Sequence, residues 1–171
     1  MAKRWSIADF TAMYDEGRGR HEIIGGRRSS QFSFPTQHRV VAGNLMMALA
    51  PVARPRGLFL PGVGVVLSEH DVVVPELMFI ERERAASTRD DDYIRVVPDF
   101  IVEVIHPEWR ELYEVTKVGL YERFGVREYW LVDPGQQRVH VYGRDDEPLE
   151  SSDTLTSRFF PGLTIAVKDL W

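Results

Sequence analysis

Three glutamates stand in segments whose other residues favour burial, and these carboxylates are the first candidates for chemistry. Glu103 lies inside Phe100-Ile101-Val102-Glu103-Val104-Ile105, which is apolar on both faces of an extended chain, as in the centre of a covered sheet. Glu76 lies between two apolar runs, and Glu22 opens another apolar segment. Each could be half of a structural salt bridge or a strand-end group that reaches water, because burying an unpaired carboxylate is costly. We favour that explanation for Glu22 taken alone, and a functional role for Glu103, because buried ionisable groups concentrate at sites.

Lys117 is the fourth candidate, because it lies on the apolar face of a predicted helix. Between residues 107 and 124, the helical spacing i, i+3, i+4 places Lys117 on one face with Tyr113, Leu120, Tyr121 and Phe124. That face should turn toward a sheet, so the lysine either extends to the surface or points into a cleft. Glu114 could instead hold Lys117 in a surface ion pair, and the residues alone leave both alternatives open.

Carboxylates on neighbouring strands together with one lysine match the needs of metal-assisted phosphodiester hydrolysis. Mg²⁺ prefers oxygen ligands and is usually held by one or two carboxylates together with water and substrate phosphate. A nearby ammonium group can orient the attacking water and stabilise the charge that develops on the phosphate. The chain has no cysteine, which excludes thiol catalysis and zinc–thiolate sites. It also has no histidine pair at metal spacing and no Gly-x-Gly-x-x-Gly loop, so zinc-protease and dinucleotide-binding sites have no support.

The helices that would position these residues follow from hydrophobic periodicity and from capping residues. We predict helices over residues 6–14, 36–52 and 107–124. Ser6 is expected to cap the first helix, and Pro51 and Pro55 are expected to end the second. The third is expected to end before Gly125.

The remaining periodic segments are short and β-rich. Strands are predicted over residues 21–24, 27–32, 58–60, 63–67, 72–80, 99–105, 127–132, 138–142 and 163–167. Pro134 and Gly135 stand in the type II turn positions of the hairpin that joins residues 127–132 to 138–142. The polar segment 81–97, which includes Asp90-Asp91-Asp92, is predicted to be a mobile loop. This order of elements predicts an α/β (α+β) fold in which helices flank a mixed β-sheet.

Length and composition limit the class of protein further. The 171 residues are expected to form one domain over residues 1–171, and 44% hydrophobic residues suffice for a full core. No apolar run approaches the length of a membrane span and no signal peptide is evident, so a cytoplasmic protein without a membrane partner is expected. The net charge of −5 is uneven: residues 1–60 carry nine Lys and Arg against four Asp and Glu. That asymmetry suits a phosphate-binding enzyme but is equally typical of an ordinary surface.

Two blocks of the sequence resemble those of a known family. Val97-Pro98-Asp99-Phe100-Ile101-Val102-Glu103-Val104-Ile105-His106-Pro107 resembles the "PDLVVEVLSP" block of a widespread bacterial family of predicted restriction endonucleases, within the PD-(D/E)xK nuclease superfamily. Lys117, Tyr121 and Glu128-Tyr129-Trp130-Leu131-Val132-Asp133-Pro134 match the "K…Y…GV-EYW-VDP" block that follows it. The resemblance covers nearly the whole chain.

Shorter segments extend the resemblance toward the N-terminus. Glu22-Ile23-Ile24-Gly25-Gly26 resembles the family's "YELIDGE" start, and Val74-Pro75-Glu76-Leu77 resembles its "PD-L" strand. His38 stands where a histidine commonly begins the family's first long helix.

The resemblance implies a restriction-endonuclease-like fold and assigns roles to the candidates. The catalytic lysine is implied to have moved from the strand to the next helix, which explains an isoleucine at position 105. Glu76 and Glu103 would hold Mg²⁺ or Mn²⁺ with help from the Val104 carbonyl, and Lys117 would position the water. Glu22 would be a further acidic member of the site. Tyr121, Glu114 and His38 would support these groups without binding the metal.

The chain departs from the family pattern at several positions. Glu76 replaces the usual aspartate, which lengthens that ligand by one methylene. Gly25 stands in place of an aspartate and His106 in place of a serine. The acidic residue expected four positions before the lysine is Tyr113, with Glu114 next to it.

Three functions from different classes remain open at this point. The resemblance favours a metal-dependent DNA endonuclease, expected to be a homodimer because cutting two strands needs two sites. Glu76 and the acidic net charge favour instead a degenerate relative that binds nucleic acid or protein without cleaving it. The third alternative is an interaction protein that uses the aromatic residues of the predicted hairpin, although Tyr129 and Trp130 are more typical of a core.

Overall fold

A six-stranded mixed sheet forms the centre of the protein. The computed structural model describes residues 3–15, 20–31, 33–88, 92–144 and 146–171. The sheet has the strand order β10-β9-β8-β7-β6-β3, in which β7 and β8 are parallel and the other neighbours are antiparallel. Its strands are β3 (Gly57–Pro61), β6 (Leu77–Glu81), β7 (Phe100–Val104), β8 (Glu128–Asp133), β9 (Arg138–Gly143) and β10 (Leu149–Ser151). The predicted mixed sheet is therefore present, and β7, the strand of Glu103, has a partner on each side.

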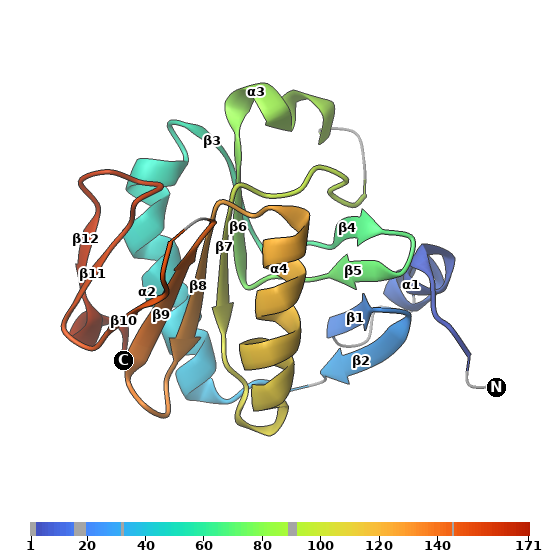
Figure 1. The fold of residues 1–171 in the computed structure, drawn as a ribbon, viewed down its shortest axis with the longest axis horizontal. Coiled ribbons are helices and arrows are strands. Elements are labelled where there is room, and N and C mark those ends of the chain that lie inside the picture. The colour runs from blue at the N-terminus through green and yellow to red at the C-terminus, as the bar shows by residue number, and fades with distance from the viewer. Residues whose placement is uncertain (1–2, 16–19, 32, 89–91, 145) are drawn as a thin grey trace.

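Helices cover the two faces of this sheet (Figure 1). The helix α2 (Thr36–Ala53) packs against one face, where it meets Val102 and Val104 of β7. The helix that ends in α4 (Val118–Phe124) packs against the other face, where it meets Ile101 and Ile105. Successive side chains of a strand point to opposite faces, so Glu103 is directed toward the α4 side. Every residue of β7 is buried, as the apolar pattern predicts.

The helix that faces Glu103 is continuous from Pro107 to Phe124 but irregular in the middle. A 3₁₀ turn (Pro107–Trp109) begins it, and a π-helical stretch (Leu112–Lys117) precedes α4. The predicted bounds are confirmed, and Gly125 ends the helix in the left-handed conformation (φ 76°), which L-residues adopt only with strain. The π-helical stretch is the difference from the prediction, and such stretches are frequent at functional sites.

A four-stranded sheet with the order β2-β1-β5-β4 lies beside the central one. Its strands are β1 (Arg20–Ile24), β2 (Arg27–Gln31), β4 (Val65–Ser68) and β5 (Asp71–Val73), and the helix α1 (Ile7–Asp15) contacts β1 and β5. The predicted single strand over residues 72–80 is wrong, because β5 and β6 belong to different sheets. Pro75 has no N–H for a sheet ladder, and the chain leaves the strand conformation at Val74-Pro75-Glu76.

Three other predictions of local structure need correction. The helix α2 does not end at Pro51 but continues to Ala53, and it ends before Pro55. Pro51 lies on the exposed side of the helix. The hairpin turn is not type II, because positive φ occurs at Gln137 (52°) and not at Gly135, while the Asp133 side chain accepts bonds from the N–H groups of residues 135 and 136.

The segment 81–97 also differs from a simple loop. It contains the end of β6, the short helix α3 (Arg82–Ala85) and a 3₁₀ turn (Ala86–Thr88); Asp90 and Asp91 lie outside the described residues. Near the C-terminus, β11 (Thr154–Thr156) and β12 (Thr164–Ala166) form a small hairpin, and a 3₁₀ turn (Val167–Leu170) follows. Only the β12 part of this was predicted.

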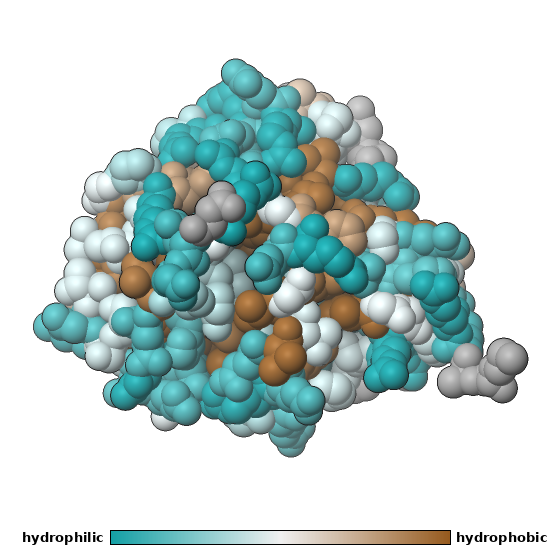
Figure 2. All heavy atoms as spheres, viewed as in Figure 1, coloured by the Kyte–Doolittle hydropathy of each residue, from teal (hydrophilic) through white to brown (hydrophobic). Residues whose placement is uncertain are grey.

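The surface on the α4 side is mostly hydrophilic. Figure 2 shows hydrophobic atoms there in separate patches and not in one continuous area. Within the described residues, no helix combines the length and hydropathy needed to span a bilayer.

Candidate active site

A buried cluster joins three of the four residues singled out from the sequence. The Lys117 ammonium lies 2.7 Å from Glu103 Oε1 and 2.8 Å from Glu22 Oε1. The side chains of Lys117 and Glu103 are 0% exposed and that of Glu22 is 1% exposed. Lys117 therefore points inward and is not held in a surface pair, which settles the alternative that the sequence leaves open.

Each member of this cluster comes from a different element. Glu103 projects from the central strand β7, Glu22 from the middle of β1, and Lys117 from the end of the π-helical stretch. The N–H of Val74, at the junction of the two sheets, donates to Glu22 Oε1 over 2.7 Å. Glu22 is thereby fixed at the meeting point of the two sheets, and its carboxylate is a buried member of the cluster and not a strand-end group in water.

Burial and mutual attraction oppose each other in this cluster. Burial tends to lower the pKa of Lys117, but the charges of Glu103 and Glu22 outweigh it and raise the pKa above its usual range. For Glu103, burial is the largest influence and raises the pKa, while Lys117 partly opposes it. Lys117 is thus a stable ammonium ion near neutral pH, and Glu103 is the group whose charge is hardest to maintain.

Tyrosines of the same helix enclose the cluster. The Tyr121 hydroxyl donates to Glu103 Oε1 over 2.7 Å, so the structure brings Tyr121 to the cluster. Lys117 lies over the ring of Tyr113, 4.7 Å from its centroid, and the Tyr113 hydroxyl donates to Gln31 Oε1 on β2. Burial raises the pKa of Tyr113 to about 12, so this hydroxyl stays protonated and serves as a donor. Gln31 was not identified from the sequence.

Glu76 lies beside this cluster, and its partner is Arg20. The Arg20 guanidinium donates from Nη2 to Glu76 Oε2 over 2.9 Å. The ring nitrogen Nε2 of His38 lies 3.6 Å from the same oxygen and 3.2 Å from the Val104 carbonyl. His38 is therefore placed between Glu76 and the Val104 carbonyl, the two groups that are expected to help hold a metal. Burial lowers the pKa of His38, which favours the neutral ring.

Arg20 escaped the sequence analysis although a signal for it exists. Alternate residues of a strand share one face, so Arg20 lies on the same face of β1 as Glu22. In the β1–β2 pairing, Arg20 is opposite Gln31. Once Glu22 is placed in the site, the strand period points to Arg20 as its neighbour.

Glu114 does not reach the cluster. It is exposed and lies 2.5 Å from Arg110, which also binds Asp133 at the start of the hairpin turn. Tyr113 takes the buried position of the π-helical stretch, so the next residue points outward. The expectation of a supporting role for Glu114 is not met by this geometry.

Two carboxylate oxygens of the cluster, Glu22 Oε2 and Glu103 Oε2, are buried and have no hydrogen-bond partner among the described residues, which is costly for an acceptor of this kind. Such oxygens are the donor atoms that a hard cation prefers. In the same part of the chain, no group of three or more His, Asp and Glu side chains is arranged to hold a metal ion. The residues present therefore do not form a cage of protein ligands, and a cation here would need water or substrate as further ligands.

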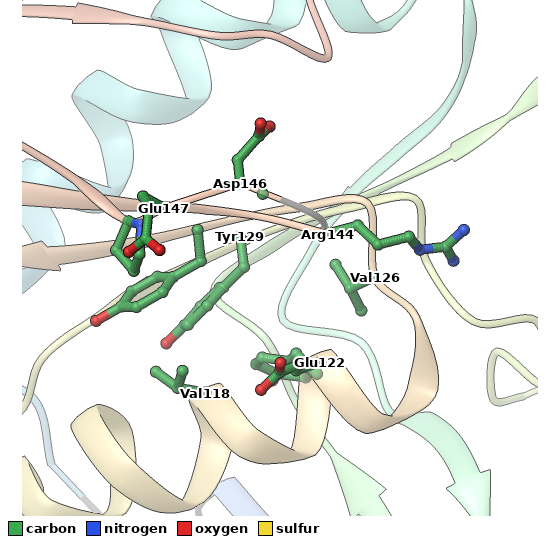
Figure 3. Close-up of a pocket in the computed structure, with 11 residues that line it drawn as sticks. Val118, Glu122, Val126, Tyr129, Arg144, Asp146 and Glu147 are labelled. Carbon is green, nitrogen blue, oxygen red and sulfur yellow. The ribbon is translucent and has the colours of Figure 1, made fainter.

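Two hollows flank the cluster. One, of about 430 Å³, lies between α4 and the β8–β9 hairpin and is lined in part by Tyr121, Tyr129 and Tyr142 (Figure 3). Its charged lining residues are Glu122, Asp146 and Glu147 against Arg144, an excess of negative charge that disfavours a phosphate, and Lys117 does not line it. The other hollow, of about 210 Å³, is lined by Ser30, Gln31, Ser33, His106, Glu108 and Trp109. We regard this smaller one as the approach to the cluster, because Gln31 is in hydrogen-bond contact with Tyr113.

Comparisons with known proteins agree with this fold. A search of curated proteins found no match. The sequence model of a family named Uma2, described as "Putative restriction endonuclease", matches residues 7–168. Among solved structures, the chain resembles a crystal structure described as "a putative nuclease belonging to DUF820" from Anabaena variabilis ATCC 29413, with 18% identity, 88% of each chain covered and a TM-score of 0.77. At this identity the likeness shows the fold, and the prediction of a restriction-endonuclease-like fold is confirmed.

Proposed function

The chain belongs to the Uma2 family, whose description is that of a restriction endonuclease, and we propose that it hydrolyses phosphodiester bonds of DNA with the help of Mg²⁺ or Mn²⁺. The observation that carries this proposal is the buried contact of Lys117 with Glu103 and Glu22. Apolar residues of similar volume often stabilise a fold as well as a buried ion pair does, so stability alone does not account for two carboxylates and a lysine enclosed by two sheets and a helix. Buried ionisable groups of this kind concentrate at functional sites.

Glu103 and Glu76 are the proposed metal ligands, with Glu22 as a third carboxylate nearby. The unpartnered oxygens of Glu103 and Glu22 supply hard donor atoms of the type that Mg²⁺ and Mn²⁺ prefer. A bound divalent ion would neutralise charge on the scissile phosphate and polarise the attacking water. His38 would hold the Val104 carbonyl in position, and Tyr121 would fix the Glu103 carboxylate through its hydroxyl.

Lys117 acts in this scheme as a hydrogen-bond donor and not as a base. Its raised pKa keeps the ammonium protonated, so it cannot accept a proton from water near neutral pH. An ammonium has three N–H donors, and Glu22 and Glu103 accept two of them. The third can orient the attacking water or stabilise a phosphate oxygen.

A homodimer remains our expectation for a protein that cuts both strands of DNA, because each chain carries one such cluster. Light scattering coupled to size exclusion measures the mass of the particle directly. A mass of twice 19.7 kDa supports cutting of both strands by one particle, and a strict monomer limits the proposal to nicking.

The test of the proposal is Mn²⁺ calorimetry and plasmid cleavage on the same samples of wild type and Glu103→Gln. We expect Mn²⁺ binding and cleavage in the wild type and loss of both in the variant. Glu122→Gln is the matched control, since Glu122 is an exposed carboxylate on the same helix as Lys117. If Glu103→Gln cleaves as fast as the wild type, the site is misassigned.

A second candidate function is binding of nucleic acid without cleavage. The observation that favours it is the occupation of the carboxylates by protein cations, with Arg20 on Glu76 and Lys117 on Glu103 and Glu22. Fluorescence anisotropy with labelled DNA separates the two functions. DNA binding without Mn²⁺ binding or cleavage supports the second candidate, and cleavage that is lost in Lys117→Met excludes it.

A further inference from the structure

Arg20 is a buried cation whose hydrogen-bonding capacity is not met by the protein. Its side chain is 11% exposed, and Nη2 donates to Glu76. The other terminal nitrogen, Nη1, is buried and has no hydrogen-bond partner in the part of the chain that the structure describes. A guanidinium with an open side of this kind fits a planar or tetrahedral anion that accepts two N–H bonds, and a phosphate is the typical case.

The position of Arg20 is defined by its neighbours. Its guanidinium carbon lies 4.9 Å from the centroid of the Phe34 ring. The Phe34 ring also contacts the His38 ring, with the two centroids 4.7 Å apart and the planes tilted by 42°. Glu76, Glu103 and Glu22 all lie close enough for their charges to raise the pKa of Arg20, although burial opposes them. Arg20 is therefore a fixed positive charge among the carboxylates and does not belong to an outer salt bridge.

The unmet donors and the unmet acceptors of this site are complementary to one ligand pair. Within the described residues, Arg20 Nη1 and Gln31 Nε2 lack an acceptor, while Glu22 Oε2 and Glu103 Oε2 lack a donor or a cation. The protein groups do not satisfy one another in this geometry. A divalent cation together with a phosphodiester would satisfy both, since the cation binds the carboxylate oxygens and the phosphate binds the guanidinium.

We infer that Arg20 is a phosphate-binding catalytic residue that, in the free protein, balances the charge of Glu76 in place of the divalent ion. When the ion binds, Arg20 gives up Glu76 to it and binds the substrate phosphate through both terminal nitrogens. This inference rests on the proposed function. It predicts that substitution of Arg20 changes metal affinity and cleavage in opposite directions. Substitution of a merely structural arginine would not have this effect.

The experiment compares wild type, Arg20→Gln and Arg20→Lys by Mn²⁺ calorimetry without DNA and by plasmid cleavage at saturating Mn²⁺. Removing the like charge that is bonded to Glu76, a proposed metal ligand, should tighten Mn²⁺ binding by about tenfold or more in Arg20→Gln. Cleavage should fall by about a hundredfold, since a donor to the reacting phosphate is lost. Arg20→Lys keeps the charge but not the two-pronged donor, so it should keep wild-type Mn²⁺ affinity and lose most cleavage.

Arg28→Gln is the control, because Arg28 lies on the neighbouring strand β2 but is exposed and contacts Trp5 away from the cluster. Its Mn²⁺ affinity and cleavage should equal those of the wild type. Unchanged or weaker Mn²⁺ binding by folded Arg20→Gln overturns the inference. In that case the proposed function still stands if the wild-type protein binds Mn²⁺ and cleaves the plasmid. Absence of Mn²⁺ binding to every protein refutes the proposed function and this inference with it.

A measurement on the wild type covers the case in which Arg20→Gln does not fold. In protein labelled with ¹⁵N-arginine, the side-chain Nε resonance missing from the spectrum of Arg20→Lys identifies Arg20. We expect this resonance to shift when Mg²⁺ is added and to shift again when a non-cleavable phosphorothioate duplex is added. A resonance that stays in place through both additions overturns the inference.

Discussion

Replacing Lys117 with methionine tests whether the buried cluster is held together by charge. The substitution keeps the length of the side chain but leaves Glu22 and Glu103 facing each other without their shared cation. Removal of one partner from a buried ion pair costs about 3–5 kcal/mol. Arg20 remains nearby and offsets part of this loss, so we expect the lower end, about 3 kcal/mol at pH 8. With a urea m value of about 2 kcal/mol/M, the midpoint should fall by about 1.5 M.

The pKa shifts of Lys117 and Glu103 determine how the stability loss in Lys117→Met changes with pH. In the wild type, the raised pKa of Lys117 means that its contribution is complete below pH 10.5 and is lost only above that value. In the variant, burial raises the pKa of Glu103 without the opposing lysine, so the folded protein takes up a proton more readily than the unfolded chain does. The unfolding free energy of the variant should therefore fall as pH rises above the ordinary glutamate value.

Urea denaturation of wild type and Lys117→Met at pH 5 and pH 8 measures this difference. The loss of stability should be clearly larger at pH 8 than at pH 5. Lys168→Met is the control, since Lys168 is exposed near the C-terminus and should show no loss at either pH. Equal losses for Lys117→Met at the two pH values would refute the account of the cluster as an ionised triad.

Three further predictions concern Tyr121 in the cluster, Asp133 at the hairpin turn and Gly125 at the end of α4. Tyr121→Phe removes the hydroxyl that donates to Glu103 and should lower the unfolding free energy by about 1.5–3 kcal/mol in urea titrations; no change would show that this bond is not made in solution. Asp133→Asn should destabilise the protein near pH 7 and lose its effect as pH falls below 3.8, because Arg110 and the turn N–H groups hold the pKa of Asp133 below its usual range against the opposing effect of burial; thermal melts from pH 2.5 to 7 check this. Gly125→Ala forces an L-residue into φ 76° at the end of α4, so the free energy of unfolding should fall by about 1–2 kcal/mol and the melting temperature by a few degrees, whereas an unchanged melting temperature would contradict the assigned cap.

The sequence carries most of the information on the central sheet and on part of the site. Glu103 could be identified because a charged residue in a strand that is apolar on both faces has few explanations. Lys117 could be placed on the inner face of its helix from spacing alone, although only the fold shows which carboxylates it meets. Glu22 needed the resemblance, since its local context is that of an ordinary strand.

The parts that escaped prediction depend on contacts between distant segments. Gln31 enters the site through the pairing of β1 with β2 and the docking of that hairpin, which no local pattern encodes. The strand period points to Arg20 only once Glu22 is known to face the site. The π-helical stretch over Leu112–Lys117 differs from an α-helix by about one residue in a turn, so a periodicity search does not separate the two. The chain break at Pro75 had a local signal, but the apolar residues on both sides of it suggested one strand.

The attachment of the β1–β2 hairpin links the buried cluster to the packing of the two sheets. The strand β1 is joined to β5 through the register pair Ile23 and Val72, the N–H groups of residues 25 and 26 bond to residues 71 and 70, and Glu22 accepts a bond from the N–H of residue 74. Arg20 and Glu22 stand on this one strand, so a displacement of the hairpin would withdraw both charges at once. The assembly of the cluster therefore depends on a single hairpin being docked.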